Sequence, residues 1–237
     1  TPAVFEDNFN DNINGVTAGN WTAVVEGTNP SVQEANQRLE VTLPANSLDS
    51  SKLVFEAGYQ STCQLQGDFD VQTDYNLLDF PQYNGVRVGL TVGARVRQSS
   101  TIYAVQRASL SLHEGGLAAS EVVGVNFTNT FGGVDVVGNT AGTLRLERVG
   151  NTLRGYRYNN NSWQLLDSAT VTTDALPVTI SAWSHNGRFD NKTVKVAFDN
   201  FKVTKGALVG ASCKVTSVAE YPTRWYQSIM PPPKQSN

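Results

Sequence analysis

Short segments in which apolar and polar residues alternate one by one dominate this sequence. Residues 69–77 show the pattern: one set is Phe69, Val71, Tyr75 and Leu77, and the other is Asp70, Gln72, Asp74 and Asn76. Because successive side chains of a strand point to opposite faces, the pattern predicts a β-strand with one apolar and one polar face. Similar segments lie at residues 86–92, 102–112, 144–149, 153–158, 163–166, 178–183 and 194–203.

Turn-forming residues separate many of these segments. Gly150-Asn151 joins two of them, and the Asn residues at 159–161 precede the next. Such sequences favour the tight turns of β-hairpins. No segment keeps the 3.6-residue periodicity of a helix over several turns. The chain is therefore predicted to form an all-β sandwich or barrel.

The charge content limits the possible partners. Charged residues make up 16% of the 237 residues and the formal net charge is −3, without a cluster of Lys and Arg. Nucleic acids and anionic membranes require concentrated positive charge, so neither is an expected partner. No apolar run approaches the roughly 18 residues of a membrane-spanning helix, so membrane insertion is not expected.

A surface rich in hydroxyl and amide groups is common in extracellular β proteins, and we expect a secreted protein.

The end of the chain differs from the rest. Residues 1–205 form one predicted β-sandwich domain, and residues 206–237 form an extension that ends in a Pro-rich tail. Three successive prolines force an extended segment that cannot join a sheet. The extension either packs back on the sandwich or docks on a neighbouring subunit. Cys63 and Cys213 are the only cysteines, and both a disulfide and two buried thiols remain open.

Four segments resemble the core strands of concanavalin A-like lectin/glucanase domains. The chain opens with Phe-Glu-Asp-Asn-Phe-Asn-Asp at residues 5–11, followed by Trp21, and the other segments lie at 67–71, 144–153 and 196–201. The resemblance covers roughly residues 4–204. It implies a jelly-roll β-sandwich of two curved antiparallel sheets, in which glycan is usually met on the concave sheet.

The same resemblance implies a structural calcium ion. Several members of this superfamily carry Ca²⁺ where the first and last strands meet, and Glu6, Asp7 and Asp199 match those places. Calcium prefers oxygen ligands, and carboxylates on neighbouring strands repel each other unless a cation or hydrogen-bond donors compensate. The alternative is that these three residues lie in turns or at an edge and accept hydrogen bonds from backbone amides.

The acidic residues argue against catalysis. Glycoside hydrolases of the superfamily often carry Glu-X-Asp-X-Glu on one concave strand, and the nearest match is Asp70-X-Gln72-X-Asp74. Its ends lie about 13 Å apart along a strand, whereas a retaining pair of carboxyl groups needs about 5–5.5 Å. Gln72 also replaces the central acid, and no two Glu residues alternate on one predicted strand. No catalytic residue is predicted.

Binding is the better-supported function. If the polar sides of strands 69–77, 86–92 and 102–112 form one concave surface, their amide, carboxylate and guanidinium groups can hydrogen-bond sugar hydroxyls, and an aromatic ring can contact the C–H face. The predicted ligand-binding residues are Asp70, Gln72, Asp74, Asn76, Arg87, Tyr103, Arg107 and Trp183. The alternative is a solvated sheet face with Arg–Asp pairs between strands.

The leading hypothesis is a secreted, lectin-like domain that binds a polysaccharide or other glycan without cleaving it. The first alternative is an extracellular structural or assembly subunit that self-associates through residues 206–237. The second alternative is a divergent glycoside hydrolase or polysaccharide lyase.

Overall fold

The structure is a computed structural model, and it describes residues 5–11, 20–46, 53–95, 102–128 and 130–211. These residues form strands and connecting turns, without a helix among them. No helix in this part of the chain has the length and apolar character needed to cross a membrane. The strands are β1 (Phe5–Asp7), β2 (Trp21–Glu26), β3 (Ser31–Ala35), β4 (Arg38–Leu43), β5 (Val54–Asp79), β6 (Arg87–Val92), β7 (Tyr103–Leu110), β8 (Ser120–Phe127), β9 (Thr130–Val136), β10 (Ala141–Val149), β11 (Thr152–Asn159), β12 (Ser162–Thr170), β13 (Leu176–His185) and β14 (Val194–Val209).

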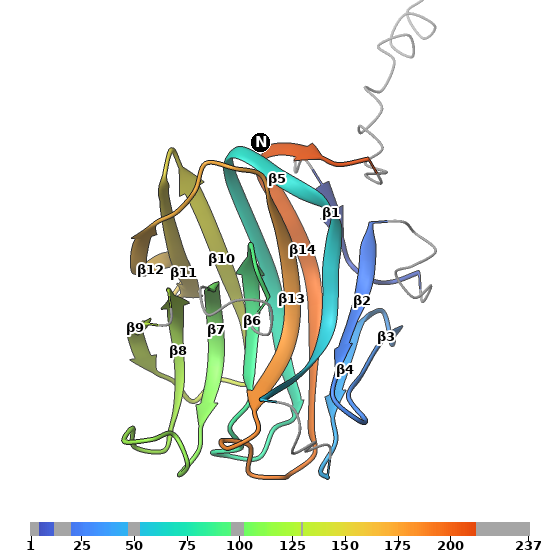
Figure 1. The fold of residues 1–237 in the computed structure, drawn as a ribbon, viewed down its shortest axis with the longest axis vertical. Helices are drawn as coiled ribbons and strands as arrows, with labels where there is room; N and C mark the ends of the chain where they lie inside the picture. The colour runs from blue at the N-terminus through green and yellow to red at the C-terminus, as the bar shows by residue number, and fades with distance from the viewer. Residues whose placement is uncertain (1–4, 12–19, 47–52, 96–101, 129, 212–237) are drawn as a thin grey trace, which may run out of the picture.

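Strand β5 organises the molecule because it belongs to both layers. It is 26 residues long, and in Figure 1 it turns over at the upper end of the molecule. The half before the turn pairs with β2 and β13, and the half after it pairs with β10. Gly67, with a φ of 70°, lies between the two halves. That left-handed backbone conformation is costly for residues with a side chain, so the glycine suits the turn.

The two layers are antiparallel sheets. The first sheet runs in the order β2-β5-β13-β6-β7-β8-β9, and the second runs in the order β3-β4-β14-β5-β10-β11-β12, with β1 paired to β14. Because β5 continues from one sheet into the other, both belong to a single hydrogen-bonded network. The prediction of an all-β jelly-roll β-sandwich of two curved antiparallel sheets is confirmed.

The core lies between the two sheets and uses the apolar sides that the alternation predicts. Fully buried side chains come from both sheets, including Phe69, Val71, Val88, Leu90, Leu144, Leu146 and Ile180. Burying each such large apolar side chain contributes on the order of 2 kcal/mol before the entropy of folding is subtracted. The hydrophobic effect therefore selects the face of each strand, and the remaining residues point away from the core.

The two ends of the domain meet. β1 pairs with β14, so that Phe5 lies opposite Val203 and Asp7 lies opposite Phe201. β14 continues to Val209, where it still pairs with β5. The domain boundary predicted at residue 205 thus falls inside a strand, and most of the extension, residues 212–237, lies outside the described residues.

Cys63 lies on β5 and is 4% exposed. It is disulfide-bonded, so it is not a buried free thiol. The other cysteine of the sequence, Cys213, lies outside the described residues.

Candidate functional site

The predicted binding surface is divided between the two sheets. Residues 69–77 lie in the half of β5 that pairs with β10 in the second sheet, whereas β6 and β7 lie in the first sheet. The assumption that these three strands form one concave surface is therefore wrong. The alternation of residues shows which side of a strand is polar, but it carries no information about which strands are neighbours.

Tyr103 and Arg107 lie on the inner side of the first sheet. They are the cross-strand partners of Val92 and Val88, and directly opposite residues lie on the same side of a sheet. Val92 and Val88 are fully buried in the core. Arg107 is 3% exposed, and one of its Nη atoms lies 2.6 Å from an Oε atom of Glu121. The ring of Tyr103 packs against Phe127, with 6.2 Å between the ring centroids. Both side chains thus lie on the core side of the sheet and not on the predicted outer surface, and Arg107 also lines a hollow with Phe80 and Glu121.

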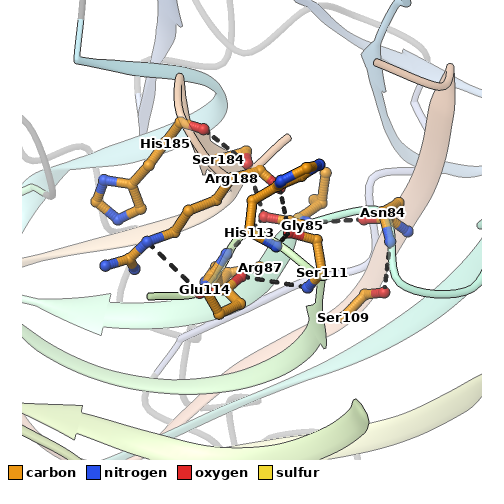
Figure 2. A network of polar contacts seen from close by, with 11 residues as sticks. Asn84, Gly85, Arg87, Ser109, Ser111, His113, Glu114, Ser184, His185 and Arg188 are labelled. Carbon is orange, nitrogen blue, oxygen red and sulfur yellow. Dashed lines mark hydrogen bonds and ion pairs between the residues drawn. The ribbon is translucent and has the colours of Figure 1, made fainter. Parts of the chain in front are cut away.

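Arg87 lies on the outer side of the first sheet, inside the polar network of Figure 2. Its Nη2 donates to Glu114 Oε2 at 2.6 Å, and its Nη1 donates to the Gly85 carbonyl at 2.6 Å. The same Glu114 oxygen lies 3.5 Å from Nε of Arg188 (Figure 2). Arg87 is only 5% exposed. Its charge is therefore neutralised within the protein, and Glu114, which contacts both arginines, ties the loop after β7 to the turn after β13.

His185, at the end of β13, makes the stability of this network depend on pH. Burial, together with the charges of Arg87 and Arg188, lowers the pKa of His185 to about 4, and the charge of Glu114 partly opposes this shift. The folded protein then binds fewer protons than the unfolded chain between pH 6.5 and about 4. The contribution of His185 to the stability of the folded state is fully present above pH 6.5, and about 3 kcal/mol is lost as the pH falls through this window.

Urea unfolding of the native chain and of His185→Gln between pH 4 and pH 7 tests this expectation. Other groups titrate in the same range, because burial and the neighbouring Asp11 raise the pKa of Glu34 to about 8. The comparison therefore uses the difference between the free energies of unfolding of the two proteins at each pH, in which the contribution of Glu34 cancels. The free energy of unfolding of the native chain minus that of His185→Gln should fall as the pH is lowered from 6.5 to 4, and a difference that does not change with pH would contradict the assignment.

Trp183 lies on the outer side of the first sheet, between Glu56 and Arg87 in register. Its ring covers Gly89, where an added Cβ atom would lie 2.6 Å from the Cη2 atom of Trp183. The side chain is only 1% exposed. Trp183 is therefore a buried ring in this structure and not an exposed platform.

Two glutamates that the sequence does not place together meet on the same side of the first sheet. Glu26 of β2 lies directly opposite Glu56 of β5. Ser181 donates to Glu56 Oε1 at 2.7 Å, and Arg95 lies 3.9 Å from Oε2 of Glu56 and 4.0 Å from Oε1 of Glu26. Burial raises the pKa of Glu56, Glu26 adds to the rise, and Ser181 and Arg95 oppose it. Only the pairing of β2 with β5 brings the two acids together, so no local sequence signal could have found them.

On the second sheet, Asp70 is held by an arginine of the next strand. Arg145 of β10 donates to both carboxylate oxygens of Asp70, at 2.9 Å from Nε and 2.5 Å from Nη2. The same guanidinium lies 4.8 Å from the ring centroid of Tyr156 and 5.2 Å from that of Trp163. Gln72 is the partner of Arg145 in register. Asp70 thus takes the alternative role that the sequence left open, an Arg–Asp pair between strands.

An open hollow on the second sheet holds other predicted residues. Asp74 lies opposite Asp199 of β14 and Thr143 of β10. Thr143 Oγ1 donates to Asp74 Oδ1 at 2.6 Å, and Asn200 Nδ2 donates to Asp74 Oδ2 at 2.9 Å. Burial raises the pKa of Asp199, and the charge of Asp74 adds to the rise. The hollow has a volume of about 450 Å³, and its polar lining residues are Arg38, Asp74, Asn76, Thr143, Asp199 and Asn200.

A second hollow adjoins the first. It has a volume of about 320 Å³ and shares Tyr75, Gly142 and Thr143 with the first hollow. Tyr158 and Asn159 of β11 line its other side. Tyr158 is 46% exposed. The polar groups of the first hollow and the exposed ring of Tyr158 therefore lie in adjoining hollows on the second sheet.

The three predicted calcium ligands do not meet at one point. Glu6 and Asp7 line a hollow with Asn200, whereas Asp199 lines the hollow around Asp74. Asp7 accepts hydrogen bonds from the Phe9 amide at 2.9 Å and from Trp21 Nε1 at 2.8 Å. Within the described ranges, no group of three or more His, Cys, Asp or Glu side chains is arranged to hold a metal ion. The three side chains therefore do not form one cluster within the described residues, and the calcium ion stays a prediction.

The sequence identifies the family. The family profile described as "Protein of unknown function (DUF1583) C domain" matches residues 1–214. The chain belongs to this family. A comparison of this DUF1583 C domain with curated protein sequences gives no match.

Solved structures of carbohydrate-related proteins share the fold of this DUF1583 C domain. The β-glucanase of Bacillus licheniformis is 14% identical with a TM-score of 0.55, and the match covers 86% of this chain and 99% of that one. A lectin from Bauhinia forficata in complex with GalNAc is 11% identical with a TM-score of 0.53, covering 85% and 98%. The xyloglucan PUL GH43B protein of Bacteroides ovatus is 14% identical with a TM-score of 0.57, covering 87% and 40%. These likenesses confirm the resemblance to the concanavalin A-like lectin/glucanase superfamily at the level of the fold.

Proposed function

We propose that this domain binds carbohydrate without cleaving it, and that the binding site is the hollow around Asp74 on the second sheet. The observation that carries the proposal is the placement of Asp74 in this hollow, with Asp199 opposite it and Thr143 and Asn200 donating to its two oxygens. These hydrogen bonds hold the carboxylate in one orientation. A carboxylate oxygen has more than one acceptor site, so Asp74 can still accept hydrogen bonds from a ligand.

The chemistry of the lining suits a neutral, hydroxyl-rich ligand. Carboxylate groups accept hydrogen bonds from sugar hydroxyls, and the amides of Asn76 and Asn200 can both donate and accept them. The acids disfavour a phosphate or another anion. Support for carbohydrate as the ligand class also comes from the structural neighbours, one named as a β-glucanase and one as a lectin in complex with GalNAc.

Asp74→Asn should weaken glycan binding by about 10-fold or more, because a hydrogen bond to a charged group contributes about 1.5–3 kcal/mol. A glycan array identifies the ligand, and isothermal titration calorimetry measures its affinity for both proteins. Asp167→Asn is the matched control, since Asp167 is an exposed aspartate of β12 outside the hollow. Absence of binding to every glycan on the array, or equal affinities for Asp74→Asn and the native chain, would refute the proposal.

Hydrolysis is the second candidate function, and Glu26 and Glu56 favour it. Cβ atoms of directly opposite residues lie about 4.5–5.5 Å apart, which allows carboxyl groups to approach the separation of about 5–5.5 Å in retaining glycosidases. The raised pKa of Glu56 suits a general acid. Reducing-sugar assays on mixed polysaccharides test this function. Turnover that Glu56→Gln abolishes would support it, and the lack of turnover by the native chain would exclude it for those substrates.

Secretion remains a proposal that the disulfide-bonded Cys63 supports, because disulfides persist in oxidising compartments. Localisation of the full-length protein in its native host tests it, and retention in the cytoplasm would refute it.

Two further predictions from the sequence stay open. Self-association through residues 206–237 predicts a larger mass by light scattering for the full chain than for a chain ending at residue 211. Structural Ca²⁺ predicts that EDTA lowers the melting temperature and that added calcium restores it. Identical masses would refute the first prediction, and a melting temperature that neither treatment changes would refute the second.

A further inference from the structure

A single row of outward-facing side chains crosses five strands of the second sheet. The register pairs Asp199 of β14 with Asp74 of β5, and Asp74 with Thr143 of β10. The last registered pair of β10 and β11 is Leu144 with Arg157. The next position on each strand brings Thr143 beside Tyr158, and Tyr158 pairs with Trp163 of β12. The row therefore runs from Asp199 through Asp74, Thr143 and Tyr158 to Trp163.

The two ends of this row differ in chemistry. One end carries the paired carboxyl groups of Asp74 and Asp199, and the other carries the rings of Tyr158 and Trp163, which meet edge to face with 5.1 Å between their centroids. Neighbouring strands lie about 4.8 Å apart, so four steps across the sheet span about 19 Å. A single sugar at one end cannot reach the other end.

The aromatic end is held in place by Arg145, which lies in the adjacent row of outward-facing side chains. Arg145 lies 5.2 Å from the ring centroid of Trp163, and Asp70 holds Arg145 by two hydrogen bonds. A ring whose orientation is already fixed loses little conformational freedom when a ligand stacks on it. Tyr158 is 46% exposed, so its ring remains accessible from solvent. Such rings offer flat apolar surface to the C–H face of a sugar, while the acids bind hydroxyls.

We propose that the ligand is an extended oligosaccharide or polysaccharide chain that lies across the strands along this row. Its hydroxyl groups contact Asp74 and Asp199 at one end, and a sugar ring further along the chain stacks on Tyr158 and Trp163. The inference rests on the proposed function, because it takes carbohydrate binding at Asp74 as its starting point. It adds the class of ligand, a chain rather than a single sugar, and the direction in which the chain lies.

A chain-length series tests the inference. The probes are β-1,3-linked and β-1,4-linked gluco-, manno- and galacto-oligosaccharides, from the monosaccharide to the hexasaccharide, with affinities measured by calorimetry. Affinity should rise with length until the row is filled. Trp163→Ala should then weaken binding of the longest chain by about 10-fold, since truncation of an anchoring Trp has effects of this size. The affinity for the monosaccharide should stay unchanged in Trp163→Ala and fall in Asp74→Asn.

Leu165→Ala is the matched control, because Leu165 is an exposed apolar residue of the same strand that pairs with Tyr156 in the adjacent row. It should bind every probe like the native chain. Affinity that depends on Asp74 but not on chain length, or that Trp163→Ala leaves unchanged for the hexasaccharide, overturns this inference and leaves the proposed function intact. A native chain that binds none of the probes and nothing on the glycan array overturns both.

Discussion

Trp21→Ala should lower the free energy of unfolding by about 4 kcal/mol, the size of effect expected when a buried Trp is truncated. Trp21 is 2% exposed and lies where the two ends of the domain meet. Its ring centroid is 4.9 Å from that of Phe201 on β14 and 5.8 Å from that of Phe9. Removal of the indole would leave a cavity bordered by the first and last strands, and urea unfolding followed by circular dichroism measures the loss.

The hydrogen bond between Trp21 Nε1 and Asp7 Oδ2, 2.8 Å long, can be separated from the packing. Trp21→Phe keeps most of the apolar contact but removes the donor, and Asp7→Asn replaces the charged acceptor by a neutral one. The two variants and their combination form a double-mutant cycle, in which we expect a coupling of about 1.5 kcal/mol. Additive effects of the two variants would contradict a structural role for this bond.

Arg148→Met should lower the free energy of unfolding by about 3–5 kcal/mol, because it leaves buried carbonyl oxygens without donors. Arg148 is fully buried. Its guanidinium donates to the Gly67 carbonyl from Nε at 2.9 Å and from Nη2 at 2.6 Å, and its Nη1 donates to the carbonyls of Thr172 and Asp174 at 3.0 and 2.7 Å. It also lies 4.7 Å from the ring centroid of Phe69. This one side chain thus ties the turn of β5 to β10 and to the segment before β13.

Arg148→Lys and Arg154→Met are the controls for this prediction. Lysine keeps the charge but lacks the planar fork of donors, so Arg148→Lys should still lose most of the stability. Arg154 lies on the outer side of β11, with 35% of its side chain exposed, and its truncation should cost less than about 0.5 kcal/mol. Both measurements use urea unfolding. If Arg148→Met is as stable as Arg154→Met, the four hydrogen bonds do not stabilise the turn of β5.

Local features of the sequence were sufficient to predict the strands and their buried sides. The alternation in residues 144–149 and 153–158, together with Gly150-Asn151, predicts a hairpin, and the structure has β10 and β11 paired in that way. Asn160 and Asn161, both with positive φ, form the turn between β11 and β12. Side-chain direction and turn conformation depend on neighbouring residues, and this is why they can be inferred without the rest of the fold.

The candidate site could be predicted only in part. Asp74 and Asn76 were assigned correctly to the polar side of a strand, and they line the open hollow. Arg87, Arg107 and Trp183 are buried, because loops and neighbouring strands cover them in ways that their own segments do not encode. Glu26 and Glu56 meet only because β2 pairs with β5. Trp163 becomes part of the row only because β12 lies at the end of the same sheet.

By itself the sequence determined the all-β class, the buried side of most strands and the resemblance to the lectin/glucanase fold, because these properties follow from the period of two in a strand and from short motifs. The tertiary structure alone decided which strands are neighbours, since that choice depends on contacts between residues far apart in the chain. β5 shows the difference: the sequence predicts a strand at 69–77, but the turn near Gly67, which carries one strand through both sheets, appears only in the fold. That turn separates Asp74 from Arg87 and places Asp74 in a row with Asp199, Tyr158 and Trp163.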